Sequence, residues 1–504
     1  MTINNLLETR TQQYPEKTFL YFDDREITFR ELNDMANRVG NGLADLGVSK
    51  GEKVCLLIRN RPEFLYAFFG TMKIGAVSVP INFNLKAEEV KYILQNAEAS
   101  TLITESSFME MIGQIQSQCP KLRTVLVLDG KRTARTVSFN DLFKASPQKP
   151  EVRLQDSDWA SIIYTSGTTG QPKGVILSHR NYLFDTQQTV KLVKLTPEDR
   201  FLCILPLFHV NGQVVTTLSP MYAGASMILT TEFKPNEFFS ILSKYKATAF
   251  SGVPTVYTIL LNLPDAEMYD LSSLRMCICG AAPMPVEVFK KFEEKFNAFI
   301  LEGYGLSEGT CVSSVNPLDG KRKIGSIGLP IPEQEMKILD DQDRERLQGE
   351  VGEIVIRGEN VMVGYYKNPE ATAEALKNGW LHTGDLGYVD PDGYFYIVGR
   401  KKEMIIRGGE NIYPKEIEEV LYRHPKIAEA AVVGLPDKIW GEEVGAFIVL
   451  KPGESLTDEE VINYCKAHLA DFKCPRRVVF TDAFPKTTTG KIQKTKLREF
   501  YSKP

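Results

Sequence analysis

The chain has 504 residues, which is too long for one hydrophobic core of ordinary size and predicts two or more domains. Its 43% hydrophobic and 25% charged residues are ordinary values for a globular protein, so global disorder is excluded. The net charge of −4, from 64 acidic and 60 basic residues, creates no strong field that would favour nucleic acid or an anionic membrane.

The start of the chain and its cysteines indicate the compartment. Residues 1–5 contain no basic segment followed by an apolar one, so no secretory signal is expected. No run approaches the ~18 apolar residues of a membrane span. The eight cysteines include no C-x-x-C pair, which disfavours zinc ribbons and thioredoxin-like sites. We therefore expect a soluble, cytoplasmic protein with no transmembrane segment.

In the first half of the chain, helical and strand patterns alternate. Residues 28–31, Thr-Phe-Arg-Glu, form a capping box, and apolar residues at helical spacing follow as far as Leu46. Apolar runs typical of buried strands occur at 54–58, 76–80, 101–104, 125–128, 201–205, 226–229, 247–251 and 276–279. Strands separated by helix-length segments predict parallel sheets with crossover helices.

The pattern changes after about residue 321. Strand-like runs occur at 335–339, 353–356 and 393–398, and Asp-Pro-Asp-Gly at 390–393 has the composition of a turn. This part, about 321–399, is expected to form a small antiparallel sheet or barrel attached to the α/β body.

A third section begins near residue 400. Helices are predicted from Pro414 and after Thr457, and strands at 429–434 and 444–450, which together make a small α+β domain. The predicted division is an N-terminal domain of residues 1–399 and a C-terminal domain of residues 400–504.

The most informative segment is 165–174, Thr-Ser-Gly-Thr-Thr-Gly-Gln-Pro-Lys-Gly, which follows an apolar run. Glycines leave backbone N–H groups accessible, hydroxyls add donors and Lys173 adds positive charge, so the loop is suited to a polyphosphate. It is not a Walker A loop, because Pro172 replaces the second glycine of that pattern and Gly174 follows the lysine. The alternative is a flexible surface loop, which the preceding strand and the Pro-Lys-Gly sequence disfavour.

Five further clusters combine glycine with polar or small residues. One of them, Tyr-Gly-Leu-Ser-Glu at 304–308, follows a strand-like run and stands where open α/β sheets bind ligands. The others are Gly-Ala-Ala-Pro at 280–283, Trp-Leu-His-Thr-Gly-Asp at 380–385, Gly-Arg-Lys-Lys at 399–402, and Lys-Thr-Thr-Thr-Gly-Lys at 486–491.

Together, the segments 164–174, 304–308, 383–385, 399–400 and 489–491 resemble the acyl-adenylate-forming superfamily of acyl-CoA synthetases, aryl-CoA ligases, luciferases and adenylation domains. The match extends over about residues 19–497 and is nearest to short bacterial fatty-acyl-CoA ligases. It implies an α/β fold whose large N-terminal domain holds two α/β subdomains plus a small β-barrel subdomain, with a small mobile α+β C-terminal domain.

The resemblance implies ATP, Mg²⁺ and coenzyme A as cofactors and assigns residues to them. Glu308 and Thr165 would hold Mg²⁺, which prefers oxygen ligands. Asp385 would bind the ribose hydroxyls, Arg400 would add a further ribose or phosphate contact, and Tyr304 would lie on the adenine. The phosphate loop would comprise Thr165, Ser166, Gly167, Thr168, Thr169 and Lys173. The rest of the nucleotide site would comprise Gly280, Ala281, Ala282, Glu302, Gly303, Gly305 and Ser307.

The resemblance also assigns catalytic roles. Lys491 would place a mobile positive charge between the carboxylate and the α-phosphate; the alternative is a solvated tail lysine. Lys402 stands at the hinge, where many family members have Asp. Rotation there would remove Lys491 and present Gly408 and Gly409 to the pantetheine arm of CoA. His209 would gate the acyl carboxylate, although a histidine after an apolar run is more often structural.

The expected acyl pocket is uncharged. It would be lined by Val210, Gln213, Val214, Ser251, Gly252, Val253, Gly280 and Gly303, with Tyr257 and Val312 nearby. A second carboxylate would be buried there without a cation, which is costly, so diacids and amino acids are disfavoured. An aliphatic acid fits best and an aryl acid next.

The expected function is therefore an ATP-dependent acyl-CoA ligase that activates a carboxylic acid, of medium or long chain, as acyl-AMP. Alternatives are an aryl-acid–CoA ligase, a stand-alone enzyme that loads a carrier protein, and a catalytically idle acyl-nucleotide binder. The intact Lys173, Glu308, Asp385 and Lys491 argue against the idle binder. The expected partners are the acid, ATP and CoA and no nucleic acid, with the chain a monomer or homodimer.

Overall fold

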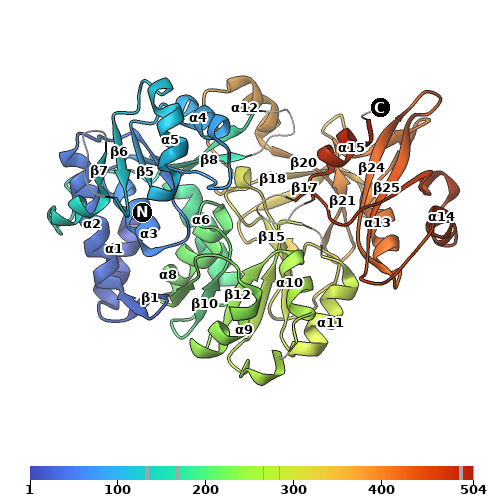
Figure 1. The fold of residues 1–504 in the computed structure, drawn as a ribbon, viewed down its shortest axis with the longest axis horizontal. Coiled ribbons are helices and arrows are strands. Elements are labelled where there is room, and N and C mark those ends of the chain that lie inside the picture. The colour runs from blue at the N-terminus through green and yellow to red at the C-terminus, as the bar shows by residue number, and fades with distance from the viewer. Residues whose placement is uncertain (131–135, 166–170, 265, 283, 487–491, 503–504) are drawn as a thin grey trace.

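Two large sheets, a small antiparallel sheet and a separate C-terminal sheet organise the chain (Figure 1). The structure is a computed structural model that describes residues 1–130, 136–165, 171–264, 266–282, 284–486 and 492–502. Within these ranges no helix is both long and apolar enough to cross a lipid bilayer.

The first sheet has eight strands in the order β19-β9-β8-β4-β3-β5-β6-β7. Its strands are β3 (Lys53–Leu57), β4 (Val77–Pro80), β5 (Thr101–Thr104), β6 (Thr124–Val127), β7 (Val137–Ser138), β8 (Trp159–Thr165), β9 (Lys173–Ser178) and β19 (Gly364–Tyr365). The strands from β8 to β7 run parallel as predicted, with the helices α2 (Phe29–Asp45), α3 (Pro62–Lys73), α4 (Ala87–Asn96) and α5 (Met109–Ile115) between or beside them.

The strands β8 and β9 are the exception, because they pair antiparallel with Thr165 opposite Lys173. Only seven intervening positions join them, too few for a parallel crossover. The phosphate segment is therefore the loop of a hairpin.

The second sheet has nine strands in the order β16-β15-β14-β13-β12-β10-β11-β1-β2. Its strands are β1 (Thr18–Phe22), β2 (Arg25–Thr28), β10 (Arg200–Cys203), β11 (Ser226–Leu229), β12 (Ala249–Gly252), β13 (Met276–Cys279), β14 (Ile300–Tyr304), β15 (Ser314–Val315) and β16 (Leu329–Pro330). Its helices are α1 (Ile3–Gln13), α6 (His179–Val193), α7 (Val210–Gln213), the π-helix η4 (Val214–Leu218), α8 (Ser219–Ala223), α9 (Pro235–Lys244), α10 (Pro254–Leu261) and α11 (Val286–Phe296). The central strands are parallel, so the carboxyl ends of β12, β13 and β14 meet at one edge.

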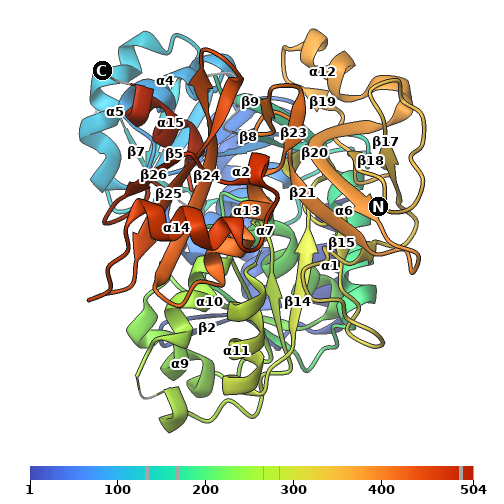
Figure 2. The same ribbon diagram turned by 90° about the vertical axis from the view of Figure 1, so that its right-hand side faces the viewer.

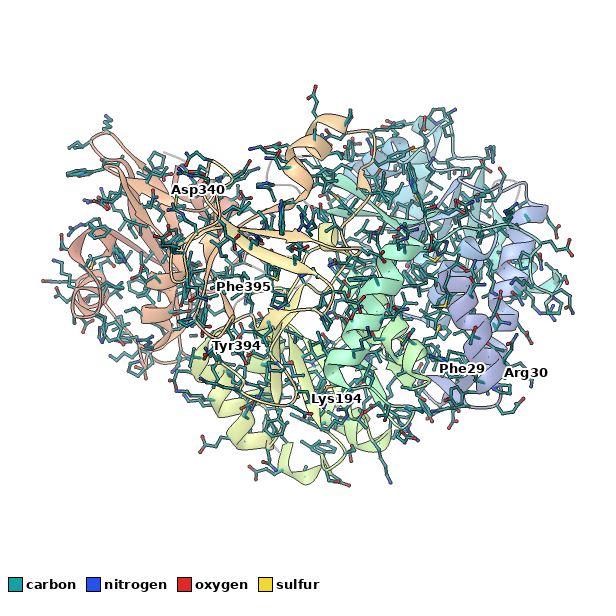
Figure 3. The ribbon with its side chains drawn as sticks, turned by 180° about the vertical axis from the view of Figure 1, so that it is seen from behind. Phe29, Arg30, Lys194, Asp340, Tyr394 and Phe395 are labelled. Atoms are coloured by element: carbon teal, nitrogen blue, oxygen red, sulfur yellow. The ribbon has the colours of Figure 1, made fainter. Side chains whose placement is uncertain are left out.

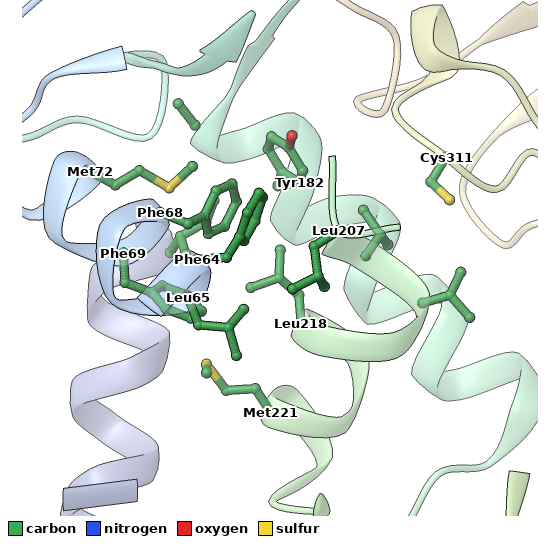
Figure 4. Packing of buried hydrophobic residues seen from close by; sticks show 14 of the residues in the cluster. Phe64, Leu65, Phe68, Phe69, Met72, Tyr182, Leu207, Leu218, Met221 and Cys311 are labelled. Carbon is green, nitrogen blue, oxygen red and sulfur yellow. The ribbon is translucent and has the colours of Figure 1, made fainter. Parts of the chain in front are cut away.

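One hydrophobic core joins these two sheets. Figure 4 shows Phe64 and Phe68 of α3 packed beside Tyr182 of α6 and Leu218 of η4. The hydroxyl of buried Tyr182 donates to Gln213 Oε1 at 2.6 Å. Because these side chains belong to a single core, the two α/β parts pack directly against each other.

A four-stranded antiparallel sheet follows, in the order β17-β18-β20-β21. Its strands are β17 (Glu335–Leu339), β18 (Gly352–Arg357), β20 (Leu381–Val389) and β21 (Phe395–Arg400), and α12 (Pro369–Ala375) precedes β20. It occupies the part expected to be barrel-like. Figure 3, which labels Phe395 and Asp340, shows it between the α/β body and the C-terminal part.

The C-terminal part has its own core. Figure 2 shows the helices of this part beside its sheet. It comprises β22 (Ile405–Arg407), β23 (Glu410–Ile412), α13 (Pro414–Tyr422), β24 (Ile427–Asp437), β25 (Gly441–Leu450), α14 (Asp458–Lys466), β26 (Arg477–Phe480) and α15 (Lys494–Ser502). The predicted helix starts at Pro414 and after Thr457 are confirmed, and Thr457 caps α14 through its side chain. The α+β composition is confirmed, whereas the exact domain boundary at 399/400 stays a prediction.

Candidate active site

A cleft of about 1190 Å³ lies where the two large sheets, the β17–β21 sheet and the C-terminal part meet. It brings together residues that are far apart in the sequence. The predicted site residues that line it are Thr165, Lys173, His209, Gly280, Ala281, Gly303, Tyr304, Gly305, Ser307, Glu308, Arg400 and Lys402.

A hydrogen-bonded trio forms one wall of the cleft. The Tyr304 hydroxyl donates to Asp385 Oδ2 at 2.7 Å, and Arg400 Nε lies 2.9 Å from Asp385 Oδ1. Asp385 and Arg400 face each other in the β20–β21 register. Asp385 raises the pKa of the Arg400 guanidinium further above its usual value. The carboxylate, 3% exposed, is thus held in a fixed orientation at the cleft, as an acceptor for hydroxyl groups requires.

Behind Tyr304, two glycines lie so close to neighbouring backbone that a side chain has little or no room. A Cβ atom on Gly305 would lie 1.5 Å from the Cys311 carbonyl oxygen, a separation no real atom pair tolerates. A Cβ atom on Gly280 would lie 3.2 Å from the Gly303 carbonyl oxygen. The loops after β13 and β14 therefore pack against neighbouring backbone and leave a side-chain-free surface beside the tyrosine ring.

Lys173 and Glu308 are joined through a residue that the sequence analysis missed. The Lys173 ammonium lies 4.9 Å from the centre of the Tyr365 ring, and the Tyr365 hydroxyl donates to Glu308 Oε1 at 2.8 Å. Tyr365 belongs to β19, which reaches this position by pairing with β9. A pairing between segments almost 190 residues apart leaves no local signal in the sequence.

Glu308 has the chemistry of a magnesium ligand. Its carboxylate lies on the short helix η6 (Ser307–Gly309), faces the cleft, and has no cation within 4 Å among the described residues. Mg²⁺ in nucleotide sites is held by one or two carboxylates together with substrate phosphates. The described chain holds no cluster of three metal-ligating side chains, so a metal at Glu308 and Thr165 needs phosphate oxygens as further ligands.

We call the uncharged, largely apolar part of the cleft lining, which includes two residues of α6, the apolar arm. None of its residues carries a charged side chain: Leu192, Val193, Leu205, Phe208, Val210, Val215, Gly252, Val253, Ile278, Cys311, Val312 and Val315. Val210, Gly252, Val253 and Val312 were predicted. The contributions of α6 and of Val315 were missed, since they come from a helix face and a sheet edge that only the tertiary fold brings here.

Four expected pocket residues do not line the cleft, and these assignments were wrong. Gln213 donates to the Leu207 carbonyl and accepts from Tyr182, so it belongs to the core behind the pocket. Tyr257 is buried and donates to the Ile278 carbonyl at 2.8 Å. Val214 and Ser251 are buried as well. Their positions on α7, η4, α10 and β12 turn these side chains away from the cleft.

His209 lines the cleft at the start of α7, with its ring centre 4.3 Å from that of Phe208. Phe208 packs edge-on against Phe83. The imidazole therefore lines the cleft beside Phe208, which belongs to the apolar arm. The gating role stays a prediction.

The turn containing Lys402 is tied to the N-terminal body by its neighbour Lys401. The Lys401 backbone N–H donates to the Gly384 carbonyl at 2.8 Å, and its ammonium lies 2.8 Å from Asp341 Oδ1 and 3.6 Å from Glu353 Oε2. The sequence analysis missed this acidic group. Lys402 itself lines the cleft.

The C-terminal loop borders the same cleft. Lys486 and Gln493 line it on either side of the predicted catalytic lysine. Lys494 lies 2.8 Å from Glu418 Oε1 and 3.4 Å from Glu403 Oε2, so this segment is fixed to α13 and to the turn after β21. Lys491 itself, and Ser166, Gly167, Thr168 and Thr169, lie outside the described residues.

Five of the described residues predicted to bind the nucleotide or CoA do not line the cleft, and one of them is Asp385, which lies behind Tyr304 and Arg400 and is bonded to both. Gly408 and Gly409 form the β22–β23 turn with φ angles of +59° and +91°, and the Gly408 N–H donates to the Trp440 carbonyl. Ala282 is half-buried beside the cleft. Glu302 is 3% exposed and lies behind the wall, 3.4 Å from the Met284 N–H.

Comparison with family models decides the classification. The AMP-binding enzyme model matches residues 7–366, and the AMP-binding enzyme C-terminal domain model matches residues 416–491. This chain belongs to the AMP-binding enzyme family. The predicted resemblance and the enzyme class, an AMP-forming acyl-CoA synthetase, are confirmed.

Relatives cover almost the whole chain. A putative acyl-CoA synthetase of Bacillus subtilis is 38% identical over 99% of this chain and 96% of its own length. A long-chain-fatty-acid–CoA ligase of the same organism is 36% identical over 99% and 94%. The structure of the anthranilate CoA ligase AuaEII with anthranoyl-AMP superposes with a TM-score of 0.93, at 34% identity over 99% and 97% of the two chains.

One further protein is represented by two structures, one with bound ATP and one without ligand. MatB from Rhodopseudomonas palustris with bound ATP superposes with a TM-score of 0.93, and the same protein without ligand with 0.81, each at 32% identity over 100% of this chain and 99% of that chain. The present chain therefore superposes more closely on the ATP-bound structure of that protein than on its ligand-free structure.

The buried carboxyl of Glu302 generates a pH prediction. Burial raises its pKa to about 7, against an opposing effect of Lys415 and with a smaller reinforcing effect of Glu419. A folded-state pKa above the unfolded value means that stability is lost as the pH rises from about 4.5 to about 7. We expect Glu302→Gln to gain stability relative to the wild type as the pH is raised from 5 to 8.

Urea unfolding of both proteins at pH 5 and pH 8 measures this effect. Glu294→Gln, on the exposed face of α11, is the matched control. Its free energy of unfolding should differ from that of the wild type by the same amount at pH 5 and at pH 8. A Glu302→Gln difference that is the same at pH 5 and pH 8 would show that this carboxyl titrates normally.

Proposed function

We propose that this chain is an ATP-dependent ligase that activates an aliphatic carboxylic acid of medium or long chain as acyl-AMP and transfers the acyl group to CoA. One observation carries the proposal. Lys173, Glu308, Tyr304, Arg400 and the described residues that flank Lys491 all line one cleft, whose lining also includes the apolar arm. Asp385 is bonded to both Tyr304 and Arg400.

In the first step, a carboxylate oxygen attacks the α-phosphorus of ATP. The new P–O bond forms as the bond to pyrophosphate breaks, and negative charge moves onto the departing phosphates. Lys173 and the donors of its loop stabilise that charge, so the contribution of the protein is mainly positioning and electrostatics. Bound Mg²⁺ would neutralise phosphate oxygens from its place at Glu308 and Thr165.

The nucleotide is oriented by the trio. Asp385 accepts hydrogen bonds from the ribose hydroxyls, while Arg400 and Tyr304 prevent its carboxylate from rotating. The tyrosine ring covers one face of the adenine, and the glycine-lined backbone at Gly280 and Gly303 leaves space for it.

In the second step, the CoA sulfur attacks the acyl carbonyl. The C–S bond forms, the C–O bond to AMP breaks, and the thiol proton passes to solvent. This attack needs Lys491 to leave the site, and rotation of the C-terminal part about Lys402 would achieve that. The turn at Gly408 and Gly409, which faces away in the present arrangement, would then meet the pantetheine arm.

The apolar arm supports an aliphatic acid. No lysine or arginine lies among its described lining residues, so a second carboxylate would be left unpaired. A relative named a long-chain-fatty-acid–CoA ligase supports the same class. An aryl acid is the second candidate, since the anthranilate CoA ligase shares the fold at 34% identity.

A panel of acids tests the substrate class. AMP release is measured with and without CoA for saturated fatty acids of increasing length, benzoate and malonate. We expect CoA-dependent turnover, at least about tenfold faster for the best fatty acid than for benzoate, because each buried CH₂ contributes about 0.8 kcal/mol. Malonate as the best substrate, or turnover that requires a carrier protein in place of CoA, would overturn the proposal.

Measuring the two half-reactions separately tests the role of Lys491. Lys491→Ala should reduce carboxylate-dependent pyrophosphate exchange by about 100-fold or more, because one stabilising charge in the transition state is lost. CoA attack on supplied acyl-adenylate should be almost unchanged. Lys496→Ala, a neighbouring cleft lysine, is the control. Equal loss of both half-reactions would refute the assigned role.

Substitution of Lys402, the proposed hinge residue, should spare the first half-reaction and impair the second. Proline fixes φ near −65°, so Lys402→Pro restricts the rotation that the second step needs. Pyrophosphate exchange should survive, while thioester formation from supplied acyl-adenylate should fall at least about tenfold. Lys402→Ala, which keeps the backbone free, should retain both activities to within a few-fold. Thioester formation that survives in Lys402→Pro would place the hinge elsewhere.

A further inference from the structure

Tyr365 lies between the two charged groups on which the proposed phosphate and metal binding depends. Its ring faces the Lys173 ammonium at 4.9 Å, and its hydroxyl donates to Glu308 Oε1 at 2.8 Å. All three side chains line the cleft. One side chain therefore contacts both a cation and an anion of the site.

The fold fixes Tyr365 in this place through its backbone. Its N–H donates to Thr372 Oγ1 at 2.9 Å, and the next N–H, that of Tyr366, donates to the Gly174 carbonyl at 2.7 Å. The same segment also holds the carboxylate-bearing loop, because the Met362 N–H donates to the Glu308 carbonyl at 2.8 Å. Residues 362–366 thus connect the base of the phosphate hairpin with the loop of Glu308.

Without a spacer, a flexible lysine and a glutamate in one cleft would pair directly. Such a pair would occupy the carboxylate and withdraw the positive charge from the phosphates. In the described chain no direct ion pair forms between Lys173 and Glu308 within 4 Å. The tyrosine stabilises each charge separately, the cation by its ring face and the anion by a hydrogen bond.

The hydroxyl keeps its proton and acts as a donor. Burial raises the pKa of Tyr365, and the Glu308 carboxylate raises it further. Among the described residues no hydrogen bond to the second carboxylate oxygen, Oε2, is formed. One carboxylate oxygen is what Mg²⁺ takes from the protein in many phosphate sites.

We propose that Tyr365 is a positioning residue that keeps Lys173 and Glu308 apart and directs the Glu308 carboxylate towards Mg²⁺ on the bound triphosphate. This inference rests on the proposed function and deepens it, because it makes the coupling between metal and nucleotide depend on a residue outside the loops that carry the charges.

The test is equilibrium binding of ATP, measured by calorimetry with and without Mg²⁺, so it needs no turnover. Tyr365→Phe keeps the ring and removes the hydroxyl. We expect its affinity for ATP alone to equal that of the wild type, and its affinity for ATP with Mg²⁺ to fall about ten- to 100-fold, the effect of one hydrogen bond to a charged group. Tyr365→Ala should weaken both, because Lys173 and Glu308 can then pair.

The neighbouring tyrosine offers a matched control. Tyr366 points to the other side, with its hydroxyl 3.4 Å from Glu98 Oε2, and Tyr366→Phe should bind as the wild type does. If Tyr365→Phe binds ATP with Mg²⁺ like the wild type, the positioning role is overturned while the proposed function stands. A folded wild type that binds no ATP at all would overturn the proposed function itself.

A double-mutant cycle guards against a merely structural effect. In a Glu308→Gln background, Tyr365→Phe should cause no further loss of Mg²⁺-dependent affinity, since the hydroxyl acts through that carboxylate. Additive losses would show that Tyr365 does not act through Glu308.

Discussion

The ion pair between Asp385 and Arg400 is the interaction on which the rest of the site depends. It lies at the end of β21, the last strand of the N-terminal body, and the chain turns at Lys402 directly afterwards. The same carboxylate that accepts the Tyr304 hydroxyl is therefore bonded to Arg400, two residues before Lys402. One contact thus joins the tyrosine at the cleft to the end of the last strand before the C-terminal part.

Much of this architecture could be predicted from local sequence. The strand β13 and the starts of α13 and α14 appear where hydrophobic period, proline and capping residues place them. The phosphate hairpin, Tyr304 and Asp385 were recognisable because each carries its chemistry within a few consecutive residues. Such segments keep their identity whatever surrounds them, so sequence reasoning reaches them directly.

The errors and omissions share a physical cause. Gln213 and Tyr257 were assigned to the acyl pocket from their order in the chain, but the faces of α7 and α10 are set by packing against Tyr182 and β13. Tyr365 was missed because its function arises from pairing with a strand far away in sequence. Side-chain direction at such positions is a property of tertiary contact and is absent from any local pattern.

The common core of Phe64, Phe68 and Tyr182 has a mechanical consequence. Because α3 and α6 share this core, a substitution that removes one of these rings would loosen the contact between the two large sheets. At the other end of the chain, Lys494 joins the C-terminal segment to Glu403, in the turn after β21.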